Sequence, residues 1–208
     1  MPNKQSAAVC HTNHPFMKRF EIDRNKVWPW IAFAVLLMGT VFQLHRQGRI
    51  WWCACGRPFL WDGDIWSAHN SQHLVDPYSF THVLHGVVFC GLVWLVIPRV
   101  RLVWRLWLAT FIESLWEILE NTQLVVQRYR EATIGLGYEG DSIANSLGDI
   151  ACCALGFLLA WRIGVKYSII LFVVVELALL ICVRDNLTLN VLMLLYPIDA
   201  IKSWQMIH

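Results

Sequence analysis

Long apolar runs separated by short polar links dominate the hydropathy pattern of this chain. The runs at 27–45, 80–97, 102–126, 142–161 and 168–183 each match a membrane-spanning helix in length, because a hydrocarbon core of about 30 Å takes about 20 helical residues. Pro98 stops the second run, and glycines mark a loop after the third. The pattern predicts an all-α fold, a polytopic helical membrane bundle of about five transmembrane helices.

Three segments fall outside these runs. Residues 1–26 are polar and predict a cytoplasmic tail, whereas 46–79 form an outer loop rich in tryptophan, which favours membrane interfaces. The stretch 186–201 is too short for a confident further span and predicts an interfacial or re-entrant helix. We therefore expect a tail followed by a single transmembrane helical domain over 27–208.

Composition supports a membrane protein whose main partner is the lipid bilayer. Hydrophobic residues make up 57% of the 208 residues, charged residues 15%, and the mean hydropathy is +0.47, whereas soluble domains carry roughly 25% charged residues. A net charge of +2, with no basic run that also holds stacking aromatics, argues against nucleic acid as a partner. The first apolar run lacks a small-residue cleavage site, so we interpret it as a retained span.

The basic residues predict the orientation of the bundle. The tail and the links at 98–105 and 162–166 carry most of the Lys and Arg near span ends, and an alternating topology puts all three on one side. The positive-inside rule makes that side cytoplasmic. The N-terminus is therefore expected in the cytoplasm and the 46–79 loop outside.

Ionisable side chains from different spans are expected to meet at the outer face. A charged residue at the centre of a span costs about 2.5 to 3.5 kcal/mol on insertion scales, so such residues should face the bundle interior and be paired. Helical spacing aligns each set on one face. The sets are His82 and His85 on the second span, Glu113, Glu117 and Glu120 on the third, and Asp141, Asn145 and Asp149 on the fourth.

Three kinds of partner can neutralise these carboxylates: arginines, protons or a divalent metal ion. Mixed His and carboxylate ligation suits zinc, iron or manganese. For a metal site the ligand candidates are His73, His82, His85 and Asp149. Glu117 or Glu120 is the candidate general base, and Arg128 or Arg130 the candidate for holding an anionic headgroup.

Other polar motifs favour structural roles. Cys53 and Cys55 form a CxC motif, a spacing unlike the CxxC pairs of zinc ribbons, so metal or redox use there is not favoured. His69 and His73 lie four apart but are interpreted as loop histidines. Asp76 is expected to cap the second span, and Asp185 or Asn186 to cap the helix that follows the fifth.

Several blocks of the sequence together carry a resemblance to a known family. They are WWCACG, SQHLVDPYSFTHVLHG, ESLWEILENT, QRYREATIGLGYEGDSIANSLGD and RDNLTLNVLMLLYP. Over about residues 46–205 the chain resembles an uncharacterised family of bacterial multi-pass inner-membrane proteins. The resemblance implies a location in the bacterial inner membrane and supplies no activity, cofactor or catalytic residue.

These observations leave three functions open. The first is a membrane-embedded, metal-assisted hydrolase or transferase that acts on a lipid or envelope precursor at the outer leaflet. The second is a small proton- or cation-coupled permease, favoured by Glu176 near the middle of the fifth span. The third is a non-catalytic membrane assembly or scaffold protein that docks through its Trp-rich loop.

Overall fold

The computed structural model describes residues 27–57, 59–135 and 137–207. Within these ranges the regular structure is helical, as the sequence predicts, apart from an isolated bridge between Trp61 and Val75. The helices are α1 (Trp28–Arg46), α2 (Ser79–Val96), α3 (Leu102–Glu120), α4 (Gln123–Ala132), α5 (Ile143–Val183), α6 (Leu187–Leu195) and α7 (Asp199–Gln205). The predicted tail at 1–26 lies outside the described residues.

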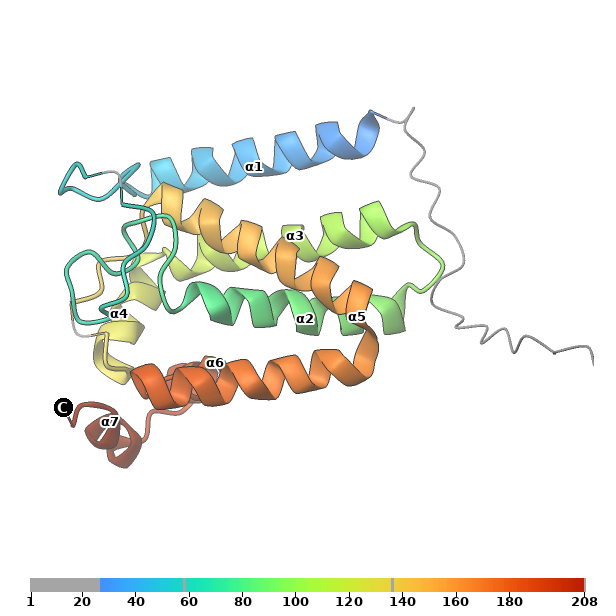
Figure 1. Ribbon diagram of the computed structural model, residues 1–208. Coiled ribbons are helices and arrows are strands. Elements are labelled where there is room, and N and C mark those ends of the chain that lie inside the picture. Colours follow the sequence, from blue (N-terminus) through green and yellow to red (C-terminus); the bar gives the residue numbers. More distant parts are fainter. Residues whose placement is uncertain (1–26, 58, 136, 208) are drawn as a thin grey trace, which may run out of the picture.

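The five apolar runs correspond to α1, α2, α3 and the two arms of α5. The chain reverses within α5 at Gly164, so that its second arm runs back along the bundle (Figure 1). Gly164 has φ 78°, a left-handed conformation that glycine adopts without the steric cost of a Cβ atom. The two predicted spans at 142–161 and 168–183 are therefore antiparallel arms joined at a single glycine.

The third helix ends earlier than its apolar run predicts. It stops at Glu120 rather than near 126, and a separate helix, α4, begins at Gln123. The reason is local: Oγ1 of Thr122 accepts a hydrogen bond from N of Val125 at 3.4 Å and caps α4. The apolar residues after the break thus belong to a new helix with a different direction.

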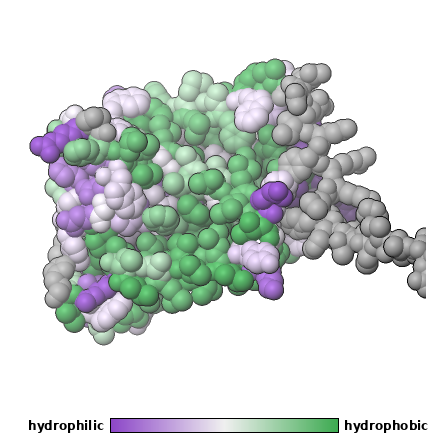
Figure 2. Space-filling view, in the orientation of Figure 1, coloured by the Kyte–Doolittle hydropathy of each residue, from purple (hydrophilic) through white to green (hydrophobic). Residues whose placement is uncertain are grey.

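Three helices of the described chain are long and apolar enough to cross a membrane: α1, α2 and α5. Helix α3 is less apolar, because Arg105 and three glutamates interrupt its run of apolar residues. It nevertheless lies among the other helices in the bundle (Figure 1). Figure 2 shows hydrophilic residues gathered at the end that carries the loops, a few more near the opposite end, and a mostly hydrophobic surface between them. This is the surface expected of a membrane-spanning bundle.

The C-terminal stretch forms two helices too short to span a bilayer, as expected for an interfacial or re-entrant segment. Asn186 caps α6 by accepting a hydrogen bond from N of Leu189 at 2.9 Å. The carboxylate of Glu176 adds to this cap, because it accepts from N of Leu187 at 2.9 Å and from N of Thr188 at 3.1 Å. Glu176 therefore has a structural role as a second cap of α6.

Helices α2 and α5 pack with their backbones in direct contact. A Cβ atom added at Gly86 would lie 2.0 Å from the carbonyl oxygen of Cys153, and one at Gly156 would lie 2.0 Å from that of Val83. Small residues at such positions let membrane helices approach closely. This contact sets the position of the polar residues that the two helices carry at the loop end.

Candidate functional site

The outer loop is tied to the start of α2 by a buried carboxylate. Oδ1 of Asp76 accepts hydrogen bonds from N of Tyr78 at 2.7 Å and from N of Ser79 at 3.2 Å, while Oδ2 accepts from N of Ser71 at 3.0 Å. Asp76 therefore caps α2 as expected. Burial raises its pKa, and the three backbone N–H donors oppose that rise.

Two histidines of α2 share one carboxylate of α3. Nδ1 of His82 lies 2.5 Å from Oε1 of Glu113, and Nδ1 of His85 lies 3.0 Å from Oε2. When Glu113 is ionised its carboxylate only accepts hydrogen bonds, and both Nδ1 atoms then carry a proton. The Nε2 atom of each histidine is then unprotonated, carries a free lone pair and faces away from Glu113.

Two further carboxylates surround His82. Nδ1 of His82 lies 3.4 Å from Oε1 of Glu117, and Nε2 lies 3.8 Å from Oδ2 of Asp149. Asp149 also accepts a hydrogen bond from Oγ of Ser79 at 2.6 Å. The Glu117 side chain is fully buried, and neither of its oxygens has a hydrogen-bond partner. A buried, unpaired carboxylate is costly unless a proton or a cation neutralises it.

A second polar group lies between α3 and the loop before α5. Nδ2 of Asn121 donates to Oδ2 of Asp141 at 2.9 Å, and the hydroxyl of Tyr138 donates to Oδ1 at 2.9 Å. Burial raises the pKa of Asp141, although these two hydrogen bonds oppose the rise. Asp141 thus holds the start of α5 against the end of α3 and fixes the position of Asp149 two turns further on.

These groups face a cavity of about 980 Å³ whose lining changes from polar to apolar. Its polar wall includes His82, His85, Glu120 and Asp149, with Glu113 and Glu117 behind them. Its apolar wall includes Phe89 of α2, Ile112, Leu115, Trp116 and Leu119 of α3, and Val191 of α6. Leu115 and Leu119 are each 50% exposed, so the cavity opens on the hydrophobic side surface of the bundle.

Comparison with known proteins assigns the chain to a family. Residues 44–207 match the family described as "Protein of unknown function (DUF2585)". The chain belongs to this family. It is 48% identical to UPF0314 protein NGR_c32320 of Sinorhizobium fredii over 88% of this chain and 93% of the relative. It is 44% identical to a UPF0314 protein of Paracoccus denitrificans over 90% of this chain and 96% of the relative.

The family relationship confirms the resemblance drawn from the sequence blocks. A further relative, UPF0314 protein R03235 of Rhizobium meliloti, is 49% identical over 88% of this chain and 92% of its own length. No solved structure shows a significant match.

The structure brings together most of the predicted site. The expectation that His82 and His85 lie within a few ångströms of carboxylates on other spans is confirmed by their contacts with Glu113, Glu117 and Asp149. Glu113, predicted to lie on the glutamate stripe, turns out to orient both imidazoles. The catalytic and metal-binding roles of these residues remain predictions.

Arg128 and Arg130, which the sequence predicted to belong to the site, lie apart from this group of histidines and carboxylates. Nε of Arg128 donates to the carbonyl oxygen of Leu194 at 2.9 Å, and Nε of Arg130 donates to that of Tyr138 at 2.5 Å. Neither arginine lines the cavity. The break before α4 is the reason, because it turns these side chains toward α6 and the loop that follows α4.

His73 also lies elsewhere, beside three residues that sequence reasoning set aside. Cys53 Sγ lies 3.2 Å from Nδ1 of His69, and Cys55 Sγ lies 3.9 Å from Nε2 of His73. An N–H of the Arg57 backbone lowers the pKa of the Cys55 thiol, whereas burial raises that of Cys53. The CxC and HxxxH spacings are the sequence signal for this group of side chains. Only the folded loop brings the two motifs together.

Proposed function

We propose that this protein is a membrane-embedded, metal-assisted hydrolase or transferase that acts on an amphiphilic lipid or envelope precursor. The observation that carries the proposal is the buried carboxylate of Glu117, which has no hydrogen-bond partner and lies beside His82. Three carboxylates meet there, and their ion-pair partners are histidines that are charged only when protonated. A divalent cation would neutralise this group of carboxylates, and carboxylate oxygens and imidazole nitrogens are donors that bind such cations.

The donor set fits a divalent ion. One ligand atom from each of His82, Glu117 and Asp149 lies within 4.8 Å of the others. A metal-binding histidine commonly donates its other N–H to a carboxylate that fixes the ring, and Glu113 holds Nδ1 of His82 in this way. One nitrogen and two carboxylate ligands suit manganese, iron or zinc.

The residues around this centre have distinct roles in a hydrolysis step. A bound divalent ion supplies Lewis-acid activation of water and of the substrate oxygen. Glu120 lines the cavity and accepts a proton from the attacking water, whose oxygen bonds to the carbonyl carbon or phosphorus. The bond to the leaving oxygen then breaks, and Glu120 returns the proton that it took from the water to this oxygen. In a transferase an acceptor hydroxyl replaces the water.

The shape of the cavity supports an amphiphilic substrate. The polar wall offers the reacting groups, while Leu115 and Leu119 form part of an opening on the hydrophobic side of the bundle. An acyl or prenyl chain can lie against this opening while its headgroup reaches His82. We place the protein in the bacterial inner membrane as a multi-pass protein, with its N-terminus cytoplasmic and the cavity at the outer leaflet, on the basis of the basic links.

Metal binding tests this proposal most directly. We expect detergent-purified protein to bind Mn²⁺, measured by electron paramagnetic resonance, and the H82A/H85A variant to lose that binding because it lacks both imidazoles. The matched control is H11A/H14A, which removes two histidines outside the described residues and should bind like the wild type. Size-exclusion elution and helical circular dichroism check that each variant is folded.

Activity provides the second arm of the test. Wild-type protein incubated with a bacterial lipid extract and Mn²⁺ should produce a headgroup- or acyl-cleaved species detected by mass spectrometry. E120Q should lower its formation by roughly 10²- to 10⁴-fold, the range for loss of a general base, while leaving Mn²⁺ binding intact. Equal Mn²⁺ binding in the wild type and a folded H82A/H85A variant would contradict the proposed site.

A further inference from the structure

The outer loop between α1 and α2 holds a group of metal-binding side chains that the proposed enzyme site does not use. Its members come from two short motifs, Cys53-x-Cys55 and His69-x-x-x-His73, on opposite halves of the loop. One ligand atom of each lies within 4.8 Å of the other three. In a tetrahedral zinc site the bond lengths put ligand atoms about 3.3 to 3.8 Å apart, close to the 3.2 Å and 3.9 Å contacts seen here.

Helix α5 holds both motifs in place by their backbones. N of Ile143 donates to the carbonyl oxygen of Ile50 at 2.8 Å, and N of Ala144 donates to that of Trp51, two residues before the CxC motif, at 3.2 Å. N of Ser142 donates to the carbonyl oxygen of Ser71 at 2.9 Å, between the two histidines. The ligands are therefore positioned by the start of one helix, independently of any ion.

His73 provides a second sign of a site. Its side chain is 2% exposed, its Nδ1 has no hydrogen-bond partner, and the rings of Trp52 and Phe59 lie edge-on at 5.9 Å and 6.0 Å. The aromatic neighbours fix the ring but offer Nδ1 no partner, and Nε2 faces only the Cys55 thiol. Burying an imidazole this way is costly unless a nitrogen finds a ligand.

We propose that the loop binds a structural zinc ion through four side chains: Cys53, Cys55, His69 and His73. Two thiolates and two neutral imidazoles form a tetrahedral set that favours zinc and balances its charge. Four protein ligands leave no open position, so the ion cross-links the loop rather than taking part in catalysis. The loop has little regular structure of its own, and Cys53, Cys55 and His69 line the cavity, so the ion clamps the part of the loop that forms a wall of the cavity.

Cobalt spectroscopy tests this proposal and separates it from the proposed enzyme site. Full-length protein is purified in detergent with a phosphine reductant and titrated with Co²⁺ alone. We expect a thiolate-to-cobalt charge-transfer band that saturates at about one ion per chain and disappears on addition of Zn²⁺. The enzyme site offers only nitrogen and oxygen ligands, so H82A/H85A should retain the band even if the proposed function is wrong.

Variants and thiol labelling complete the test. C53S/C55S should lose the band and about one zinc ion per chain, whereas C152S/C182S, which removes two thiols of α5, should keep both. If C53S/C55S does not fold, zinc protection of Cys53 and Cys55 from alkylation in the wild type gives the same answer. The proposal is overturned if reduced wild-type protein shows no thiolate band, or if Cys53 and Cys55 are disulfide-bonded in protein alkylated directly in cells.

Discussion

At the scale of single residues, buried carboxylates determine how this protein holds together. Asp185, at the end of α5, is 2% exposed and collects hydrogen bonds from four donors. They are the Tyr78 hydroxyl, the Asn186 backbone N–H and the side-chain amides of Asn190 and Gln205. Through these contacts one carboxylate joins the start of α2, the end of α5, α6 and α7.

Replacing Asp185 should change how stability depends on pH. Burial raises its pKa from 3.8 to about 6, although its hydrogen bonds oppose the rise. The folded chain therefore keeps this proton at a higher pH than the unfolded chain. The free energy of unfolding falls as pH rises from about 4 to 6, and above that range the ionised Asp185 costs a constant amount of about 3 kcal/mol. In D185N this fall should be absent. Thermal unfolding in detergent across this pH range measures the difference between the two proteins.

An exposed carboxylate gives the control for that measurement. Asp199 begins α7 and is exposed, so D199N should follow the wild type in parallel across the range. A constant difference in melting temperature between D185N and the wild type would contradict the argument. It would mean that Asp185 has the same proton affinity in the folded and unfolded chains.

At the scale of helices, the contact between α2 and α5 decides whether the polar groups meet. His82 and His85 lie on α2, and Asp149 lies on α5, so their separation depends on how closely those helices pack. Gly86 and Gly156 bring the two backbones into contact, and Gly148 brings α5 against the carbonyl oxygen of Leu74 in the outer loop. The hydrogen bond from Ser79 to Asp149 then crosses the same contact.

An added methyl group at this contact should separate the helices. G86A places a Cβ atom 2.0 Å from a backbone oxygen of α5, so we expect a loss of about 3 kcal/mol or more in the free energy of unfolding. G91A on the same helix meets nothing within 4 Å and should be neutral or stabilising by up to about 1 kcal/mol, since alanine favours the helix. Unfolding by detergent titration measures both variants. Equal stabilities would show that α2 and α5 do not pack this closely.

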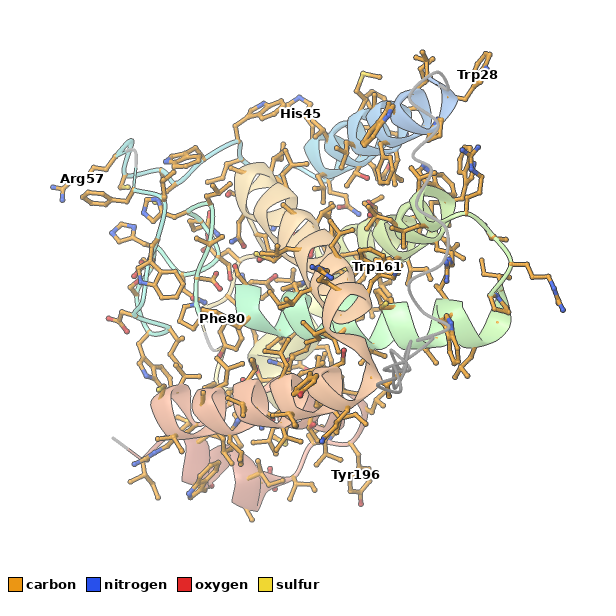
Figure 3. All side chains as sticks on the ribbon, turned by 45° about the vertical axis from the view of Figure 1, so that its right-hand side comes forward. Trp28, His45, Arg57, Phe80, Trp161 and Tyr196 are labelled. Carbon is orange, nitrogen blue, oxygen red and sulfur yellow. The ribbon has the colours of Figure 1, made fainter. Side chains whose placement is uncertain are left out.

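At the scale of the whole molecule, polar structure is concentrated at one end. The outer loop, the loop before α5 and the C-terminal helices share that end, and the reversal at Gly164 lies at the other (Figure 1). Figure 3 shows Arg57 far out on the loop side and Trp28 at the opposite end of α1 from His45. The basic Arg162 and Lys166 flank the reversal. The molecule therefore has a polar end that holds both candidate metal sites and a basic end.

The two ends should lie on opposite sides of the membrane. A reporter that is active only in the periplasm should be active when fused at Gly63, in the outer loop, and inactive when fused at Gly164, because basic links stay in the cytoplasm. Cell fractions probed for each fusion check that both are produced. Activity at Gly164 without activity at Gly63 would reverse the orientation and place the cavity at the inner leaflet.

Much of the architecture could be predicted from the sequence because it depends on local pattern. Apolar run length predicts the helices, and spacing predicts that Glu113 and Glu117 share one face. Asp76 was identifiable as a cap because capping involves residues adjacent in the chain. The same reasoning placed the end of α3 too late, since the apolar pattern continues through the turn that Thr122 begins.

Contacts between distant segments were decided by the tertiary structure. Periodicity gives the face on which a residue lies but not which face of another helix it meets, so the pairing of Glu113 with both histidines required the packing of α2 against α3. The CxC motif carried little signal alone, and His73 was assigned to the wrong group of side chains. Its actual neighbours are set by hydrogen bonds from the start of α5 to both halves of the loop, and no local pattern encodes a contact between three segments so far apart in the chain.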